Sequence, residues 1–277
     1  MTARQIDRRR LKAETRELLR SAQVPPRAMT ALYLGLLLAL NLADYLAGGV
    51  SSGLPGTFVT VLTALVSGVL GAGFALYCMA VRRGERAEFL TLFDGFSFVG
   101  KIIGLSIVTA AFTFLWSLLF VIPGVIAAYR YRFAMYNLLE DPELGILEAL
   151  DMSKRQTDGY KGQLFLLDLS YLGWGLLASL PSLAESAYLY LQILQDPNGF
   201  MADPTRLVPL VSSALVMSLL IWLWSMAVNL FYLPVYQCVE LGYFETAKET
   251  SGVGADVRPP WNDGWGGQSG PDDLGGY

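Results

Sequence analysis

The sequence contains no histidine and only two cysteines, Cys78 and Cys238. The absence of histidine excludes Ser-His-Asp and Cys-His relays, and also zinc and haem sites with histidine ligands. Two thiols are too few for a four-thiolate metal site, and no phosphate-binding glycine loop, EF-hand loop or acidic metal pair is present. We therefore expect a protein that is not an enzyme and holds no metal or cofactor, with both cysteines as small buried hydrophobes.

Charged residues are also scarce, at 16% of the 277 residues, against about 25% in an ordinary soluble domain. Hydrophobic residues make up 53% of the chain, and its mean hydropathy is +0.43. This composition is too apolar for a disordered chain and too poor in charge for the surface of a soluble enzyme. The sequence therefore predicts an all-α protein, a polytopic membrane helix bundle.

The few charges are unevenly distributed within a net charge of −4. Residues 1–28 contain eight Lys or Arg and three acidic residues, whereas the rest of the chain is acidic. A basic segment can indicate nucleic-acid binding, but apolar segments follow at once, and cytoplasmic flanks of membrane spans favour Lys and Arg. We expect no nucleic-acid partner. The segment is expected to be a basic amphipathic helix, either held on the cytoplasmic surface by anionic lipid or extended into solvent.

Six apolar segments are candidate membrane spans, because a bilayer core about 30 Å thick requires roughly 20 apolar helical residues. They are residues 29–47, 57–80, 102–122, 125–139, 164–180 and 207–235. The fourth is short and contains two arginines, and the sixth is long enough to tilt. Pro181 is expected to end the fifth.

The distribution of cations predicts the orientation of these spans. With the N-terminus inside, seventeen Lys and Arg residues lie on the inner side and one, Arg206, lies on the outer side. This asymmetry satisfies the positive-inside rule. We therefore expect a multi-pass protein of the cell membrane with both termini in the cytoplasm. Its partners are the lipid bilayer, with anionic lipid at the cytoplasmic face, and a possible membrane protein.

The predicted organisation has three parts: a basic N-terminal helix (1–28), a six-helix transmembrane domain (29–248) and a flexible Gly/Asp-rich cytoplasmic tail (249–277). Within the transmembrane domain, residues 84–101 are expected to form an interfacial amphipathic helix. Residues 141–162 are expected to form a cytoplasmic helix with one apolar face.

Three charged residues within the predicted spans, Arg130, Arg132 and Asp168, form a candidate charge site. A charge within a membrane costs about 2.5–3.5 kcal/mol on insertion scales, so each needs a partner or a function. By helical rise, the arginines lie about 10–13 Å and the aspartate about 6 Å from the inner ends of their spans. We expect one arginine to pair with Asp168. Three roles remain open for these charges. They form a structural salt bridge that holds spans four and five together, or they form an anion or headgroup site or a proton-linked carboxylate, or the arginines simply snorkel to the membrane surface.

Small residues predict where helices pack closely. One stripe at four-residue spacing consists of Ala64, Gly68 and Ala72, and a second consists of Ser67, Gly71 and Ala75. A further pair at the same spacing is Gly100 and Gly104. Such spacing lets helix backbones approach, which favours the second span as the centre of the bundle over a glycine-lined pore. Pro123 and Gly124 are expected to form the hairpin turn between spans three and four. The alternative at these two residues is a discontinuous helix beside a substrate site.

The region from Trp116 to Trp174 combines an Ile-Pro-Gly stretch, a span bearing Tyr and Arg, a Ser-Lys-Arg stretch and an Asp-Leu-Ser run that ends in Gly-Trp. With the basic opening TARQIDRRRLKAETRELL, it resembles the bacterial membrane-protein family catalogued as domain of unknown function 975. The resemblance implies a polytopic membrane fold and no particular activity. The chain departs from the family in the long Gly/Asp tail that follows PVYQCVELGYFE.

Two functions remain after these exclusions. The basic and amphipathic inner segments favour a non-enzymatic membrane-binding or scaffold protein, or an accessory of an envelope or export system. The alternative is a small transporter or permease that uses the buried Arg and Asp charges. Transporters often contain two similar halves, and no internal repeat is found here. An intramembrane enzyme is disfavoured by the absent histidine and paired-carboxylate motif.

Overall fold

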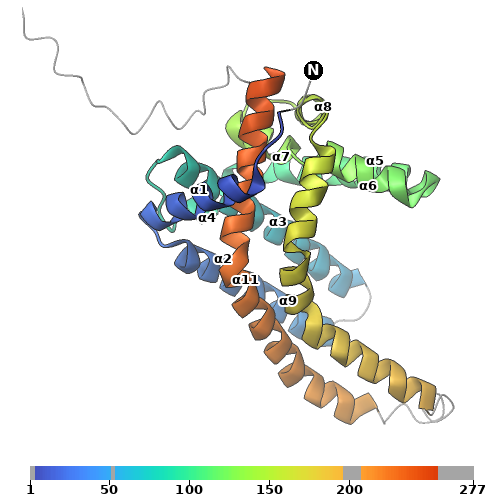
Figure 1. Cartoon of the computed structure of the whole chain (residues 1–277). Coiled ribbons are helices and arrows are strands. Elements are labelled where there is room, and N and C mark those ends of the chain that lie inside the picture. Colours follow the sequence, from blue (N-terminus) through green and yellow to red (C-terminus); the bar gives the residue numbers. More distant parts are fainter. Residues whose placement is uncertain (1–3, 51–53, 196–206, 255–277) are drawn as a thin grey trace, which may run out of the picture. The chain divides into compact units, whose positions relative to one another are not determined.

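The computed structural model describes residues 4–50, 54–195 and 207–254, and every element in these ranges is helical. The elements are α1 (Arg8–Ser21), α2 (Pro26–Val50), α3 (Leu54–Arg83), α4 (Thr91–Asp94), the 3₁₀ helix η1 (Gly95–Phe98), α5 (Val99–Leu119), α6 (Val121–Arg130), α7 (Ala134–Glu140), α8 (Ile146–Gln156), α9 (Lys161–Gln195) and α11 (Leu207–Ser251) (Figure 1). The predicted all-α fold class is confirmed.

Five stretches of the described helices are long and apolar enough to cross a membrane. They are Pro26–Ala47, Pro55–Arg83, Thr91–Leu118, Lys161–Tyr188 and Val216–Ser251. They correspond to the first, second, third, fifth and sixth predicted spans. The chain therefore has helices typical of a membrane protein. None of these five stretches covers the fourth predicted span, residues 125–139.

The chain divides into two compact units, which we describe separately. In the described residues, the hairpin unit comprises Arg4, Ser97–Lys161 and residues 244–254. The span unit comprises the described parts of Gln5–Phe96 and Gly162–Tyr243.

In the span unit, two cationic side chains of α1 donate hydrogen bonds to α9. Asp7 caps α1 by accepting hydrogen bonds from two backbone N–H groups of the first turn. Arg8 Nη1 donates to the backbone oxygen of Leu166 at 2.8 Å, and Lys12 Nζ donates to Ser170 Oγ at 2.9 Å. Burial, followed by the neighbouring charge of Arg8, lowers the pKa of Lys12. The sequence analysis placed this helix on the lipid surface or in open solvent, and it did not predict the contacts with α9.

Helix α3 contacts α2 and α4 in the same unit. A Cβ atom on Gly73 would lie 1.8 Å from the backbone oxygen of Leu92, and one on Gly95 would lie 2.4 Å from that of Val69. Only glycine permits backbones to approach this closely. The tightest approaches of α3 to α4 and to η1 therefore depend on two glycines that the spacing argument did not select.

Pro181 lies inside α9 and does not end it, contrary to the prediction. Proline lacks the N–H that would bond the backbone oxygen of Leu177, four residues earlier. Trp224 Nε1 of α11 donates to this oxygen instead, at 2.9 Å. Because the released carbonyl has another donor, α9 continues to Gln195.

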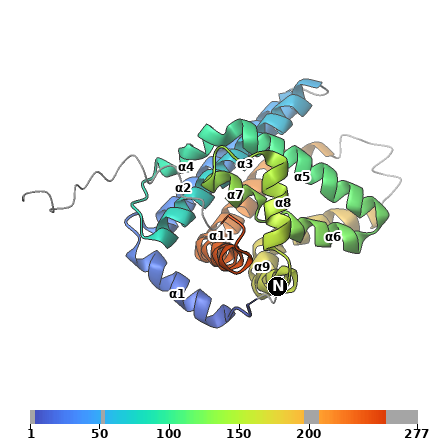
Figure 2. The ribbon, with the colours of Figure 1, turned by 90° about the horizontal axis from the view of Figure 1, so that it is seen from above.

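In the hairpin unit, α6 folds back along α5 (Figures 1 and 2). The chain reverses at Phe120, where the backbone is extended (φ −163°, ψ 155°). Pro123 and Gly124 lie in the first turn of α6 rather than at the expected reversal, and a first turn tolerates proline. A Cβ atom on Gly124 would lie 2.0 Å from Ser117 Oγ. Gly124 thus allows α6 to approach α5.

The tip of this hairpin is strongly apolar and exposed. Leu118, Phe120, Val121 and Ile122 are each between 72% and 77% exposed. A contiguous exposed apolar surface of this kind marks a membrane or protein contact. In a membrane protein, the tip is suited to face lipid.

The fourth predicted span, residues 125–139, is interrupted. Helix α6 contains ten residues, which rise about 15 Å, half the thickness of a bilayer core. Helix α7 follows after a break, and its Leu138 packs in a core with Leu105 of α5 and Leu150 of α8. The prediction of one continuous span over residues 125–139 is therefore wrong. The apolar residues of α7 are buried against other parts of the protein.

The other predicted segments are only partly single helices. Residues 84–101 contain α4, η1 and the start of α5 rather than one interfacial helix. Helix α8 lies inside 141–162 and begins at Ile146. Helix α11 extends two residues past 249, and most of the predicted tail, residues 255–277, lies outside the described residues.

Candidate functional site

Helices α6 and α7 are separated by Tyr131–Phe133, and hydroxyl groups of α8 and of its C-terminal capping residue bond the backbone at this break. Ser153 Oγ donates to the backbone oxygen of Arg130 at 2.9 Å and accepts from the backbone nitrogen of Phe133 at 3.0 Å. Thr157 Oγ1 also donates to the Arg130 oxygen, at 3.3 Å. Helix ends leave backbone groups without partners inside the helix. Here α8 supplies those partners and stabilises the break.

Replacing Ser153 by Ala is expected to lower the free energy of unfolding by about 1–2 kcal/mol, because the Phe133 N–H loses its acceptor in a buried position. Ser106→Ala is the matched control, since the Ser106 hydroxyl bonds a carbonyl of its own helix. Thermal unfolding of both variants in detergent measures the difference. Equal melting temperatures would show that the hydroxyl does not hold the break.

Buried polar side chains join α7, α8 and the end of α11. The amides of Asn137 and Gln156 exchange two hydrogen bonds, at 2.8 and 2.9 Å, and Gln156 Nε2 also donates to the backbone oxygen of Val253 at 3.1 Å. Lys248 Nζ lies 2.6 Å from a carboxylate oxygen of Glu140, and their side chains are only 14% and 6% exposed. Buried polar groups that are bonded in this way favour one rigid arrangement.

A cavity of about 590 Å³ adjoins these contacts, and we call it the basic cavity. Its lining consists of Arg130, Lys154, Arg155, Gln156, Asp158, Tyr160, Lys161, Thr250, Ser251 and Val253. Four of these side chains are cationic and one is acidic, so the cavity is suited to bind an anion. Within the described ranges, no group of three or more His, Cys, Asp or Glu side chains is placed to hold a metal ion.

The three residues of the predicted charge site are divided between the units. In the hairpin unit, Arg130 ends α6 and lines the basic cavity, and the Arg132 guanidinium lies 5.4 Å from the ring centre of Tyr129. In the span unit, the Asp168 carboxylate accepts a hydrogen bond from Tyr236 Oη at 2.8 Å. The pairing of Asp168 with an arginine stays a prediction.

The predicted packing residues have different environments. They range from buried (Ala72, Ala75) through half-buried (Ser67, Gly71, Gly104) to exposed (Ala64, Gly68, Gly100). A Cβ atom on Gly104 would lie 2.5 Å from the side chain of Ile146 in α8. Among the described residues, no neighbouring atom lies within 4 Å of a Cβ atom built on Gly68 or Gly100. The close approach is therefore concentrated in the second half of α3.

Sequence reasoning missed the buried polar contacts of the hairpin unit. Asn137 lies inside the predicted fourth span, and Glu140 follows its last residue. An amide and a carboxylate at the end of an apolar segment are a signal that this segment buries against polar protein groups. Their partners, Gln156 and Lys248, could not be identified from spacing because they are 19 and 108 residues away.

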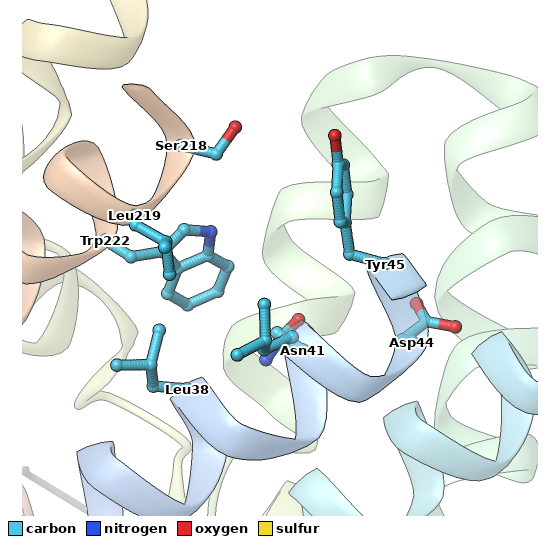
Figure 3. A pocket seen from close by; sticks show the side chains of 8 residues that line it. Leu38, Asn41, Asp44, Tyr45, Ser218, Leu219 and Trp222 are labelled. Carbon is cyan, nitrogen blue, oxygen red and sulfur yellow. The ribbon is translucent and has the colours of Figure 1, made fainter. Parts of the chain in front are cut away.

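A second cavity, of about 260 Å³, lies in the span unit between α2 and α11 (Figure 3). Asn41 of α2 and Trp222 of α11 line it from the two helices, and Ser218 adds a hydroxyl (Figure 3). Asn41 Nδ2 already donates to a carbonyl of its own helix, and Asp44 accepts a hydrogen bond from Thr60. Two of the polar side chains that line this cavity, Asn41 and Asp44, are thus engaged with the protein.

Comparison with known proteins identifies the region that contains the break. No curated protein and no solved structure matches the chain. Residues 118–250 match the model of the family described as protein of unknown function (DUF975). This range includes α6, α7, α8 and both buried polar pairs. The resemblance in the sequence is therefore confirmed by the match of this family model to residues 118–250.

Proposed function

We propose that this protein is a non-enzymatic membrane-binding or scaffold protein, which acts as an accessory of an envelope or export system. The observation that carries the proposal is the pairing of buried polar side chains with one another in the hairpin unit. Asn137 bonds Gln156, and Glu140 bonds Lys248. Polar groups held in this way stabilise a rigid binding surface, whereas a transporter needs polar groups that can exchange partners with a solute.

We further propose that both termini face the cytoplasm. Lys101 Nζ, near the start of α5, donates to the backbone oxygens of Pro142 and Leu144, the latter at 3.0 Å. These contacts support a hairpin whose two ends lie on the same side of the membrane. Because the chain returns to that side, the interruption of the fourth span does not change the predicted orientation of the helices that follow. The cations that follow, Lys154, Arg155 and Lys161, favour the cytoplasmic side.

The partners we propose are the lipid bilayer, with anionic lipid at its cytoplasmic face, and a membrane protein, with no nucleic acid. The chain has no histidine, which supports a protein without the common catalytic relays. The exposed apolar hairpin tip supports contact with lipid or with another membrane helix.

The second candidate function, a small transporter, is favoured by the cavity between α2 and α11 (Figure 3). It contains an amide, a hydroxyl and an indole between two helices that are each long enough to span a membrane. Transport requires that such a cavity open alternately to both sides.

Thiol labelling tests the two functions and the orientation together. Both native cysteines are buried, so single substitutions Ser218→Cys and Lys154→Cys introduce the reactive thiols. A membrane-impermeant maleimide is applied to intact cells and to inside-out vesicles. We expect Lys154→Cys to react only in the vesicles, since its side chain is 52% exposed and proposed to be cytoplasmic. Ser218→Cys is expected to react from one side at most.

Two results would contradict these proposals separately. Labelling of Lys154→Cys in intact cells would reverse the orientation. Labelling of Ser218→Cys from both sides would favour alternating access and therefore the transporter. The native chain, treated in parallel, controls for reaction of Cys78 and Cys238.

A further inference from the structure

The basic cavity of the hairpin unit contains more positive charge than its own carboxylates balance. Lys161 lies 3.4 Å from Asp158, whose side chain is 82% exposed. Lys154 and Arg155 share one carboxylate, that of Asp151. Exposed ion pairs of this kind are weak and exchange readily with other anions. The lysines and Arg155 are therefore available to a ligand that carries negative charge.

Arg130 provides the second observation. It is the last residue of α6 and lines the cavity. Its Nε atom is buried and, among the described residues, has no hydrogen-bond partner. A buried donor without an acceptor is unfavourable. The planar guanidinium is suited to bind two oxygens of a phosphate group at once.

The surface next to Arg130 indicates the source of this phosphate. Ile126, one turn before Arg130 on α6, and its neighbour Val125 are each 46% exposed, and the apolar hairpin tip lies just before them in the chain. A ligand that satisfies both surfaces has a negatively charged group for the cavity and a hydrocarbon part for α6. A soluble anion uses only the first.

We propose that the basic cavity binds the phosphate group of an anionic phospholipid, with Arg130 bonded to the phosphate oxygens and Lys154, Arg155 and Lys161 around them. The acyl chains then lie along the exposed face of α6. This site rests on the proposed function in one respect, namely that the hairpin enters the membrane beside the cytoplasmic leaflet.

Lipid titration of the purified full chain in detergent tests the site. Native mass spectrometry counts bound phosphatidylglycerol, with phosphatidylcholine and inorganic phosphate as the comparison ligands. The variants are Arg130→Gln and the double change Lys154→Gln/Arg155→Gln. The double change alters exposed side chains and preserves the fold. Arg86→Gln is the matched control, because Arg86 is exposed and lies outside the cavity lining.

We expect phosphatidylglycerol to bind more tightly than phosphatidylcholine. Both cavity variants should weaken this binding about tenfold, the effect of one charge-assisted hydrogen bond, and Arg86→Gln should change it less than twofold. Inorganic phosphate that binds as tightly as phosphatidylglycerol would overturn the lipid source and leave a soluble anion as the ligand. Equal binding by the native chain and both cavity variants would overturn the site. Because the titration is done in detergent, its failure is independent of the orientation that thiol labelling measures.

Discussion

Replacing Lys248 by Met is expected to lower the free energy of unfolding by about 3–5 kcal/mol, because the change leaves the Glu140 carboxylate buried without the Lys248 charge. The two groups lie 2.6 Å apart, and the Glu140 side chain is only 6% exposed. The pair connects α7 to α11, so its loss should loosen the hairpin unit. Chemical denaturation of the full chain in mild detergent, followed by circular dichroism, measures the effect.

The double variant Glu140→Leu/Lys248→Met should recover most of this loss, because apolar replacement of a buried ion pair is often neutral. Arg10→Met is the matched control. Arg10 lies 2.9 Å from Glu14, but their side chains are 79% and 52% exposed, and removal of such a pair costs less than about 1 kcal/mol. A Lys248→Met variant as stable as Arg10→Met would contradict the structural role of the buried pair.

The helices of the span unit were predictable because hydropathy and length determine where a chain can cross a bilayer. The first, second and sixth predicted spans lie within α2, α3 and α11. Helix ends were less predictable. Pro181 carries a strong stop signal, and α9 continues through it because the donor for the Leu177 oxygen comes from Trp224, a residue distant in sequence.

The break between α6 and α7 could not be predicted from local sequence. Residues 131–133 are Tyr, Arg and Phe, and contain neither glycine nor proline. The groups that bond the backbone there belong to Ser153 of α8 and to Thr157, the residue that caps α8. Tertiary contacts of this kind override a weak helix propensity.

The candidate site was predictable in part. Arg130 was selected because a charge in an apolar segment needs a partner or a function, and the structure places it in the basic cavity. Lys154, Arg155 and Lys161 entered the sequence argument as cations on the inner side, and the first two also as part of the Ser-Lys-Arg stretch, but none was a candidate for the charge site. Their convergence with Arg130 depends on how α8 packs near the end of α6, which spacing along the chain does not reveal.

Replacing Trp224 by Phe is expected to destabilise the chain by about 2–3 kcal/mol, because the Leu177 oxygen then has neither an indole donor nor an N–H from Pro181. Trp222→Phe is the matched control. It removes the same atoms from a neighbouring side chain of similar exposure, 42% against 45% for Trp224. Thermal unfolding in detergent compares the two variants.

The change Pro181→Ala tests the cause of this effect. Alanine restores the N–H that bonds the Leu177 oxygen within α9, so Trp224→Phe should be about 1–2 kcal/mol less destabilising in the Pro181→Ala background than in the native one. A coupling of this sign means that the indole replaces the missing backbone donor. If Trp224→Phe has the same effect in both backgrounds, the indole bond does not explain how α9 continues through a proline, and the cause must lie in the packing of α9 itself.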